Sequence, residues 1–186
     1  MMNAANSRLI DMLSTYQPDG PTETADVART RNLVESTVNP WARSIPLHVT
    51  ASALIVHPES GRVLLRWHQR QQAWLQIGGH ADPGETDPLQ VTCREGREET
   101  GLTDLAPWPT AELIHVVIVP VAARGDEPAH HHADLRFVLA TSTPERAQPE
   151  SPDAPLRWLL LPEAVEATSE ANLRESLRRV APMLEV

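Results

Sequence analysis

Residues 79–102 have the sequence GHADPGETDPLQVTCREGREETGL, the most informative stretch of the chain. Glu95, Glu98 and Glu99 stand at positions i, i+3 and i+4, so a helix would place them on one face. Like charges at this spacing destabilise a helix unless a cation lies between them. Mg²⁺ prefers oxygen ligands and is usually shared with substrate phosphates. The stretch therefore predicts a helix that brings a metal ion to a phosphate.

The same stretch resembles the signature of the Nudix hydrolase family. That signature is Gly, five residues, Glu, seven residues, and then Arg-Glu-aliphatic-x-Glu-Glu-x-Gly-aliphatic. Chance agreement at seven fixed positions is on the order of one in 10⁸. The matching residues are Gly79, Glu85, Arg94, Glu95, Glu98, Glu99, Gly101 and Leu102.

Two positions depart from the family signature. Eight residues separate Glu85 from Arg94, one more than usual, and Gly96 stands where an aliphatic residue is typical. The additional residue falls near Pro88, which fits the first turn of a helix and leaves the spacing from Arg94 onward unchanged. Gly96 should weaken the helix by about 1 kcal/mol relative to Ala. Every charged position survives, so we expect an intact site.

The resemblance implies a metal site and a set of catalytic residues. Mg²⁺ or Mn²⁺ would be held by the carboxylates of Glu95, Glu98 and Glu99, with the backbone carbonyl of Gly79. The implied reaction is hydrolysis of a diphosphate linkage in a nucleoside diphosphate joined to another group X. The metal would lower the pKa of an attacking water, and Glu98 or Glu95 would take its proton. Glu112 and Glu127, outside the signature, remain alternative bases.

The remaining signature residues have supporting roles by the same resemblance. Arg94 either contacts phosphate or pairs with a carboxylate of the signature and orients it; we favour the second role while retaining Arg94 as a catalytic candidate. Glu85 should stabilise the junction of loop and helix through Arg94. Gly84 shapes the loop, and Gly101 is a natural residue to end the helix.

Outside the signature, three residues are weaker candidates for substrate binding, namely Arg66, His131 and His132. Imidazoles can bind metal ions or hydrogen-bond to phosphate. For the run from His130 to His132 we favour solvent-exposed rings in a loop and at the start of a strand. The resemblance to relatives with a His-rich segment before a similar strand implies the alternative, a position near the active site.

The pattern of apolar residues and turn signals predicts an α/β fold, a Nudix-type α/β/α sandwich with a mixed central sheet. Residues 1–44 should form a helical extension and residues 45–186 the Nudix domain. Thr22 and Ser169 are the expected N-caps of two helices. We expect helices at residues 3–16, 22–38, 88–100, 162–167 and 169–183, and strands at 48–56, 62–67, 74–77, 111–121, 133–141 and 156–161.

Charge and composition indicate which binding partners and which compartment suit this chain. The formal net charge of −9 argues against binding of a nucleic-acid polymer, whereas a small diphosphate substrate can be held through a metal ion. No run of eighteen apolar residues predicts a membrane span, and no signal-peptide pattern is evident. The single cysteine suits a reducing compartment, so we expect a cytoplasmic protein. The sequence is compatible with a homodimer.

Two other functions were weighed. A Nudix-like nucleotide-binding or regulatory domain would hydrolyse nothing; only Gly96 favours it, because no acidic residue of the signature is lost. An isopentenyl-diphosphate isomerase shares the fold but needs a cysteine on a strand before the signature. The only cysteine, Cys93, lies inside the signature helix, which makes the isomerase improbable.

Overall fold

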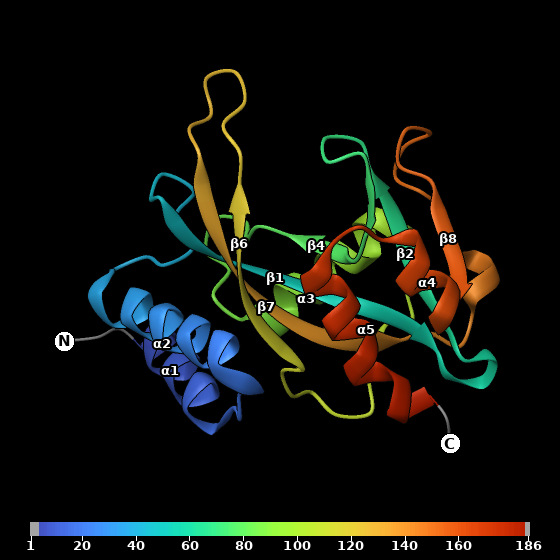
Figure 1. The fold of residues 1–186 in the computed structure, drawn as a ribbon, viewed down its shortest axis with the longest axis horizontal. Coiled ribbons are helices and arrows are strands. Elements are labelled where there is room, and N and C mark those ends of the chain that lie inside the picture. The colour runs from blue at the N-terminus through green and yellow to red at the C-terminus, as the bar shows by residue number, and fades with distance from the viewer. Residues whose placement is uncertain (1–3, 185–186) are drawn as a thin grey trace.

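The computed structural model describes residues 4–184 and contains one mixed sheet with helices on both faces (Figure 1). This confirms the expected fold class. The helices are α1 (Ala4–Thr15), α2 (Gly20–Ser36), α3 (Pro88–Thr100), α4 (Leu161–Ala167) and α5 (Ala171–Leu184). The strands are β1 (Leu47–His57), β2 (Arg62–His68), β3 (Ala73–Leu75), β4 (Ile77–Gly79), β5 (Ala106–Pro107), β6 (His115–Val121), β7 (His130–Ala140) and β8 (Leu156–Leu160).

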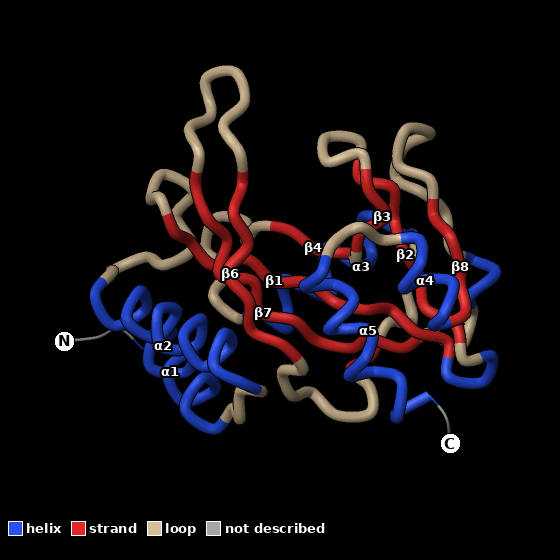
Figure 2. Tube along the Cα trace, viewed as in Figure 1, coloured by secondary structure: helices blue, strands red, loops and turns tan. Residues whose placement is uncertain are grey.

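Strand β1 organises the sheet. It pairs parallel with β7 along nearly its whole length, and antiparallel with β2 and β4. The sheet order is β3-β2-β1-β7-β5, with β8 beside β2 and β6 beside β7. The hairpin between β1 and β2 turns at residues 58–61, where Gly61 takes the left-handed conformation. Figure 2 shows the loop between β6 and β7 projecting beyond the body of the sheet.

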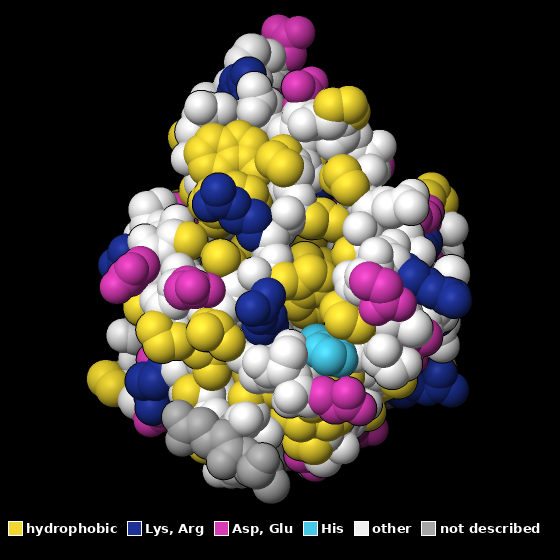
Figure 3. All heavy atoms as spheres, turned by 90° about the vertical axis from the view of Figure 1, so that its right-hand side faces the viewer, with side chains coloured by type: hydrophobic (Ala, Val, Ile, Leu, Met, Phe, Trp, Pro, Cys, Tyr) yellow, Lys and Arg dark blue, Asp and Glu magenta, His cyan; other side chains and the backbone are white. Residues whose placement is uncertain are grey.

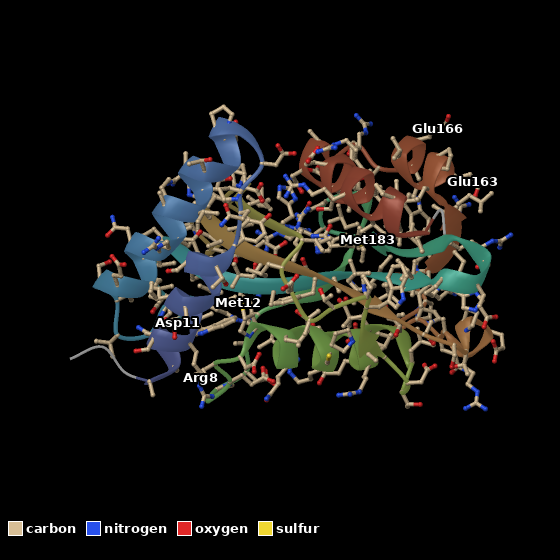
Figure 4. All side chains as sticks on the ribbon, turned by 90° about the horizontal axis from the view of Figure 1, so that it is seen from below. Arg8, Asp11, Met12, Glu163, Glu166 and Met183 are labelled. Carbon is tan, nitrogen blue, oxygen red and sulfur yellow. The ribbon has the colours of Figure 1, made fainter. Side chains whose placement is uncertain are left out.

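The two faces of the sheet are covered by different helices, as the edge-on view of Figure 4 shows. Helix α3 packs on one face, against β1, β4 and β7. Helices α4 and α5 cover the other, where Leu173, Leu177 and Val180 meet Leu54 and Val56. Because strand side chains alternate between faces, the even-numbered residues of β1 point toward the α4–α5 side. Burial on both faces explains why β1 is an almost continuously apolar run.

Helices α1 and α2 lie at the end of the molecule opposite α4 and β8 (Figures 1 and 4). Leu9 and Leu13 of α1, with Val27 and Val34 of α2, join the same hydrophobic cluster as the α3 face of the sheet. The N-terminal helices therefore share the hydrophobic core on the α3 face of the sheet, which is separate from the cluster under α4 and α5.

Several expected boundaries were wrong. Helix α2 begins at Gly20 with Pro21 in its first turn, so Thr22 is not its N-cap. Helix α5 begins at Ala171, two residues after Ser169. The strand expected from residue 111 starts at His115, because residues 111–114 form bends rather than extended, paired backbone. The strand expected from residue 133 starts at His130, because β6 and β1 both pair with its first residues.

The helices and the surface were compared with what a membrane span or a charged partner would need. None of the described helices has both the length and the apolar character needed to cross a membrane. On the face toward α4 and β8, basic and acidic side chains are interspersed among apolar ones (Figure 3).

Candidate active site

The loop before α3 is shaped by two glycines of β4. Gly78 has φ of 145°, and a Cβ there would lie 2.4 Å from the Cα of Ser52 on β1. A Cβ on Gly79 would lie 2.9 Å from the carboxylate of Glu95. A side chain at position 78 would push β4 away from β1, whereas one at position 79 would displace the carboxylate of Glu95.

Helix α3 spans the range predicted from the sequence. Asp87 caps it by accepting hydrogen bonds from the backbone N–H groups of Leu89 and Gln90, with Pro88 in the first turn. Gly101 ends it in the left-handed conformation, with its N–H donating to the carbonyl of Arg97. Both ends are thus specified by local sequence.

Arg94 hydrogen-bonds to both the loop before α3 and the helix itself. Its Nε and Nη2 donate to the two carboxylate oxygens of Glu85, and Nη2 also donates to the carbonyl of His80 at 2.9 Å. Its Nη1 lies 3.0 Å from Oε1 of Glu95 and 2.9 Å from Oε2 of Glu98. Hydrogen bonds from Arg94 lower the pKa of Glu85. Arg94 therefore orients three carboxylates at once.

The three carboxylates of α3 differ in their surroundings. Glu99 accepts from the backbone N–H of Gly78 and pairs with Arg66, whose Nη1 lies 3.1 Å from its Oε1. Burial raises the pKa of Glu99 to about 7 and also raises the pKa of Glu95. Glu98 is the most exposed of the three, with 55% of its side chain accessible to solvent.

The negative charges of these acids are balanced by arginines that pair with them. Arg94 and Arg66 divide the three carboxylates of α3 between them. All available ligand atoms are oxygens, and two of the acids are buried against the backbone of β4. A donor set of this kind suits a hard divalent cation. The oxygen donors of Glu95, Glu98, Glu99 and the carbonyl of Gly79 are therefore of the type that the expected metal prefers, although the ligand atoms of the three acids do not all lie within 4.8 Å of one another.

A cleft of about 190 Å³ opens on the other side of β4. Gly78 and Gly79 form part of its wall, and Thr50, Ser52 and Asp134 lie on its floor. The cleft and the acids of α3 therefore meet at the backbone of β4. The other lining residues are His68, Gln71, Leu75, Gln76, His80, Val119, His132, Arg136, Glu170 and Asn172.

A buried ion pair forms the floor of the cleft. Asp134 and Arg136, neighbours on one face of β7, are 5% and 2% exposed, and Nε of Arg136 lies 2.8 Å from Oδ2 of Asp134. Thr50 and Ser52 donate their hydroxyl hydrogens to the same carboxylate. Burial alone would raise the pKa of Asp134, but Arg136 and the hydroxyls hold it below its usual range. Sequence reasoning missed this pair, which depends on the register of β1 and β7.

The structure separates the predicted histidines. His131 is exposed, whereas His130 is buried and His132 half-buried on the face that carries the cleft. The expectation that all three rings are exposed was therefore wrong. His132 lines the cleft together with His80, a residue that sequence reasoning did not single out.

The other candidates lie outside the cleft, and among them Arg66 contacts an acid of α3. Arg66 contacts Glu99 and Glu150 rather than the cleft lining. Glu112 is exposed in the segment before β6. Glu127, in the loop between β6 and β7, is bound by Arg70 at 2.6 Å. Gly84 adopts the positive φ of 95° that its turn requires.

Comparison with known proteins agrees with this geometry. The NUDIX domain model matches residues 46–180. The chain belongs to this family, and the expectation of a Nudix-type pyrophosphohydrolase is confirmed at that level. Comparison with curated proteins gave no match.

Solved structures share the fold. A binary complex of a C. elegans Ap4A hydrolase is 22% identical, with a TM-score of 0.58, over 73% of this chain and 96% of that chain. The E. coli dihydroneopterin triphosphate pyrophosphohydrolase is 19% identical, with a TM-score of 0.57, over 73% of this chain and 95% of that chain. A MutT NUDIX hydrolase from Burkholderia pseudomallei is 25% identical, with a TM-score of 0.50, over 72% and 98%.

Proposed function

We propose that the protein is a metal-dependent hydrolase that cleaves a diphosphate linkage in a nucleoside diphosphate joined to another group. The observation that carries the proposal is the meeting of acids and cleft at β4. Glu99 binds the N–H of Gly78, and the same glycine lines the cleft. A substrate in the cleft would thus place its phosphates beside the acids of α3.

In this proposal, Glu95, Glu98, Glu99 and the carbonyl of Gly79 hold Mg²⁺ or Mn²⁺. The ion, when bound, neutralises phosphate charge and lowers the pKa of water. Glu98 takes the proton of the attacking water, because it is the most exposed acid of the three. Arg94 keeps Glu95 and Glu98 in place, and Glu85 fixes Arg94. We further propose a cytoplasmic location, since the single cysteine suits a reducing compartment.

The relatives suggest where to look for the substrate. The names of the structural neighbours refer to Ap4A and to dihydroneopterin triphosphate. We therefore propose testing a panel of dinucleoside polyphosphates, nucleoside triphosphates and nucleoside diphosphate derivatives. Product release should require Mg²⁺ or Mn²⁺ and should stop when a chelator removes the ion.

The variant Glu98→Gln tests the residue assignment. It should fold normally and lose at least ~10²-fold in rate, as expected for a positioned proton acceptor. Glu166→Gln is the matched control, because Glu166 is an exposed acid that projects from α4 (Figure 4). Full activity of Glu98→Gln would remove Glu98 from the mechanism. Retained nucleotide binding with no turnover across the panel would favour the alternative, a Nudix-like binding or regulatory domain.

A further inference from the structure

Four imidazole rings lie close together outside the group of acids on α3, and two of them, those of His80 and His132, line the cleft. His48 comes from β1, His130 and His132 from β7, and His80 from the loop after β4. The ring centroid of His48 lies 5.3 Å from that of His130, 4.9 Å from that of His132 and 5.1 Å from that of His80. We call these four residues the histidine cluster.

Strand register produces this cluster. His48 is the parallel partner of His132, and His130 lies two residues before His132 on the same face of β7. Side chains two residues apart in a strand share a face, so the three rings must lie together once β1 and β7 pair. His131, between them, points to the opposite face and is exposed.

Backbone carbonyls orient two of the rings. Nδ1 of His48 lies 3.0 Å from the carbonyl oxygen of Ile45, and Nδ1 of His130 lies 2.9 Å from that of Pro128. A carbonyl oxygen can only accept, so both Nδ1 atoms carry hydrogen. In the neutral rings, each Nε2 therefore presents a lone pair. Metal-binding histidines are commonly oriented by such a bond from the second ring nitrogen.

The Nε2 atoms face one another. Those of His130 and His132 are 3.1 Å apart, as are those of His48 and His80. One ring nitrogen each from His48, His130 and His132 lies within 4.8 Å of the others, and among the described residues no other trio of acidic, histidine or cysteine side chains meets that limit. A tetrahedral Zn²⁺ at 2.0–2.1 Å from each nitrogen separates its ligand atoms by about 3.3 Å. Small rotations of the rings would reach that spacing.

We propose that the histidine cluster is a second metal site, which binds a transition-metal ion such as Zn²⁺ through His48, His130 and His132, with His80 available as the fourth ligand. Imidazole nitrogen suits Zn²⁺, whereas the oxygen donors of α3 suit Mg²⁺ or Mn²⁺. The carboxylate of Glu127 lies 3.7 Å from Nε2 of His130 but is bound by Arg70. This proposal does not depend on the hydrolase assignment.

A metal ion bound by the histidine cluster would lie beside a substrate held in the cleft. His80 and His132 both line the cleft, next to Gly79. An ion bound there would lie beside the cleft rather than among the acids of α3. Because its ligands belong to β1, β7 and the loop after β4, the ion would also tie these three segments together.

Metal binding itself is the test. Untagged protein, stripped with a chelator and returned to buffer with excess Mg²⁺, should bind one Zn²⁺ per chain in calorimetric titration. Co²⁺ should give the visible absorption bands of a tetrahedral nitrogen site. His132→Ala should lower Zn²⁺ affinity by at least about 100-fold, since it removes a ligand outright, whereas loss of a group that only hydrogen-bonds to a ligand costs about 10–100-fold.

The chain offers a matched control one residue away. His131→Ala should keep wild-type Zn²⁺ affinity, because its ring lies on the opposite face of β7. Glu98→Gln should keep it as well, which separates this site from the acids of α3. If His132→Ala fails to fold, His48→Gln serves in its place, with circular dichroism as the check on folding. Absence of stoichiometric Zn²⁺ binding by the wild type, or unchanged affinity in a folded cluster variant, would overturn the proposal.

Discussion

Arg94 binds both carboxylate oxygens of Glu85, with Nε 3.0 Å from Oε1 and Nη2 2.9 Å from Oε2. Eight residues separate the two in sequence, one more than the family signature has. The loop absorbs the additional residue before Asp87 caps α3, so the pairing is preserved. The departure in spacing therefore leaves the contact between loop and helix intact.

This pair should contribute to stability. Glu85→Gln should lower the free energy of unfolding by about 1–2 kcal/mol, because charge-assisted hydrogen bonds are lost from a largely covered pair. Arg94→Lys should cost more, since one ammonium group cannot contact Glu85, Glu95, Glu98 and the carbonyl of His80 together. Urea unfolding in the presence of a chelator measures both. Arg29→Lys, at an exposed position of α2, should change stability by less than about 0.5 kcal/mol.

The side chain of Leu105 leaves no room for a side chain at Gly96. A Cβ at Gly96 would lie 2.7 Å from Cδ1 of Leu105, so the leucine occupies the space that a side chain at position 96 would need. Gly96→Leu should therefore destabilise the protein by about 1–3 kcal/mol through overpacking. Leu105→Ala alone should cost about 2–5 kcal/mol through a cavity. The double variant should be more stable than the sum predicts by at least about 1 kcal/mol. Additive losses in urea unfolding would show that the two side chains do not compete for this volume.

The ion pair under the cleft should be costly to break from one side. Arg136→Met leaves the buried carboxylate of Asp134 without its cation and should cost about 3–5 kcal/mol. Asp134→Asn combined with Arg136→Met removes both charges and should recover part of that loss. Thermal and urea unfolding of the single and double variants would check this. A double variant as unstable as the sum of the single variants would contradict it.

Acid should weaken the attachment of the N-terminal helices. Burial alone would raise the pKa of Glu23, but hydrogen bonds from Arg179 and Tyr16 lower it to about 2. A lowered pKa in the folded state contributes stability above the unfolded value of 4.5, and this contribution disappears as pH falls toward 2. The stability gap between wild type and Glu23→Gln should therefore shrink over that range, by an amount on the order of 3 kcal/mol. A gap that is constant from pH 6 to about pH 3 would contradict this linkage.

Local sequence predicted much of the site. The limits of α3 follow from Asp87, Pro88 and Gly101, whose capping preferences act within a few residues. The spacing of the three acids along one helix was also readable without tertiary structure. Boundaries failed where pairing partners decide them, as for β7, whose first residues look like a polar loop until β6 and β1 pair with them.

Residue spacing along single segments was enough to predict the family, the acidic helix and the alternation of strands and helices. The meeting of the histidines, and the burial of Asp134 and Arg136 together beside the cleft, became visible only once the strands were paired. Those contacts depend on the parallel register of β1 and β7, two strands more than 70 residues apart in sequence. Register is specified by burial of both faces of the sheet at once, which no local pattern reports.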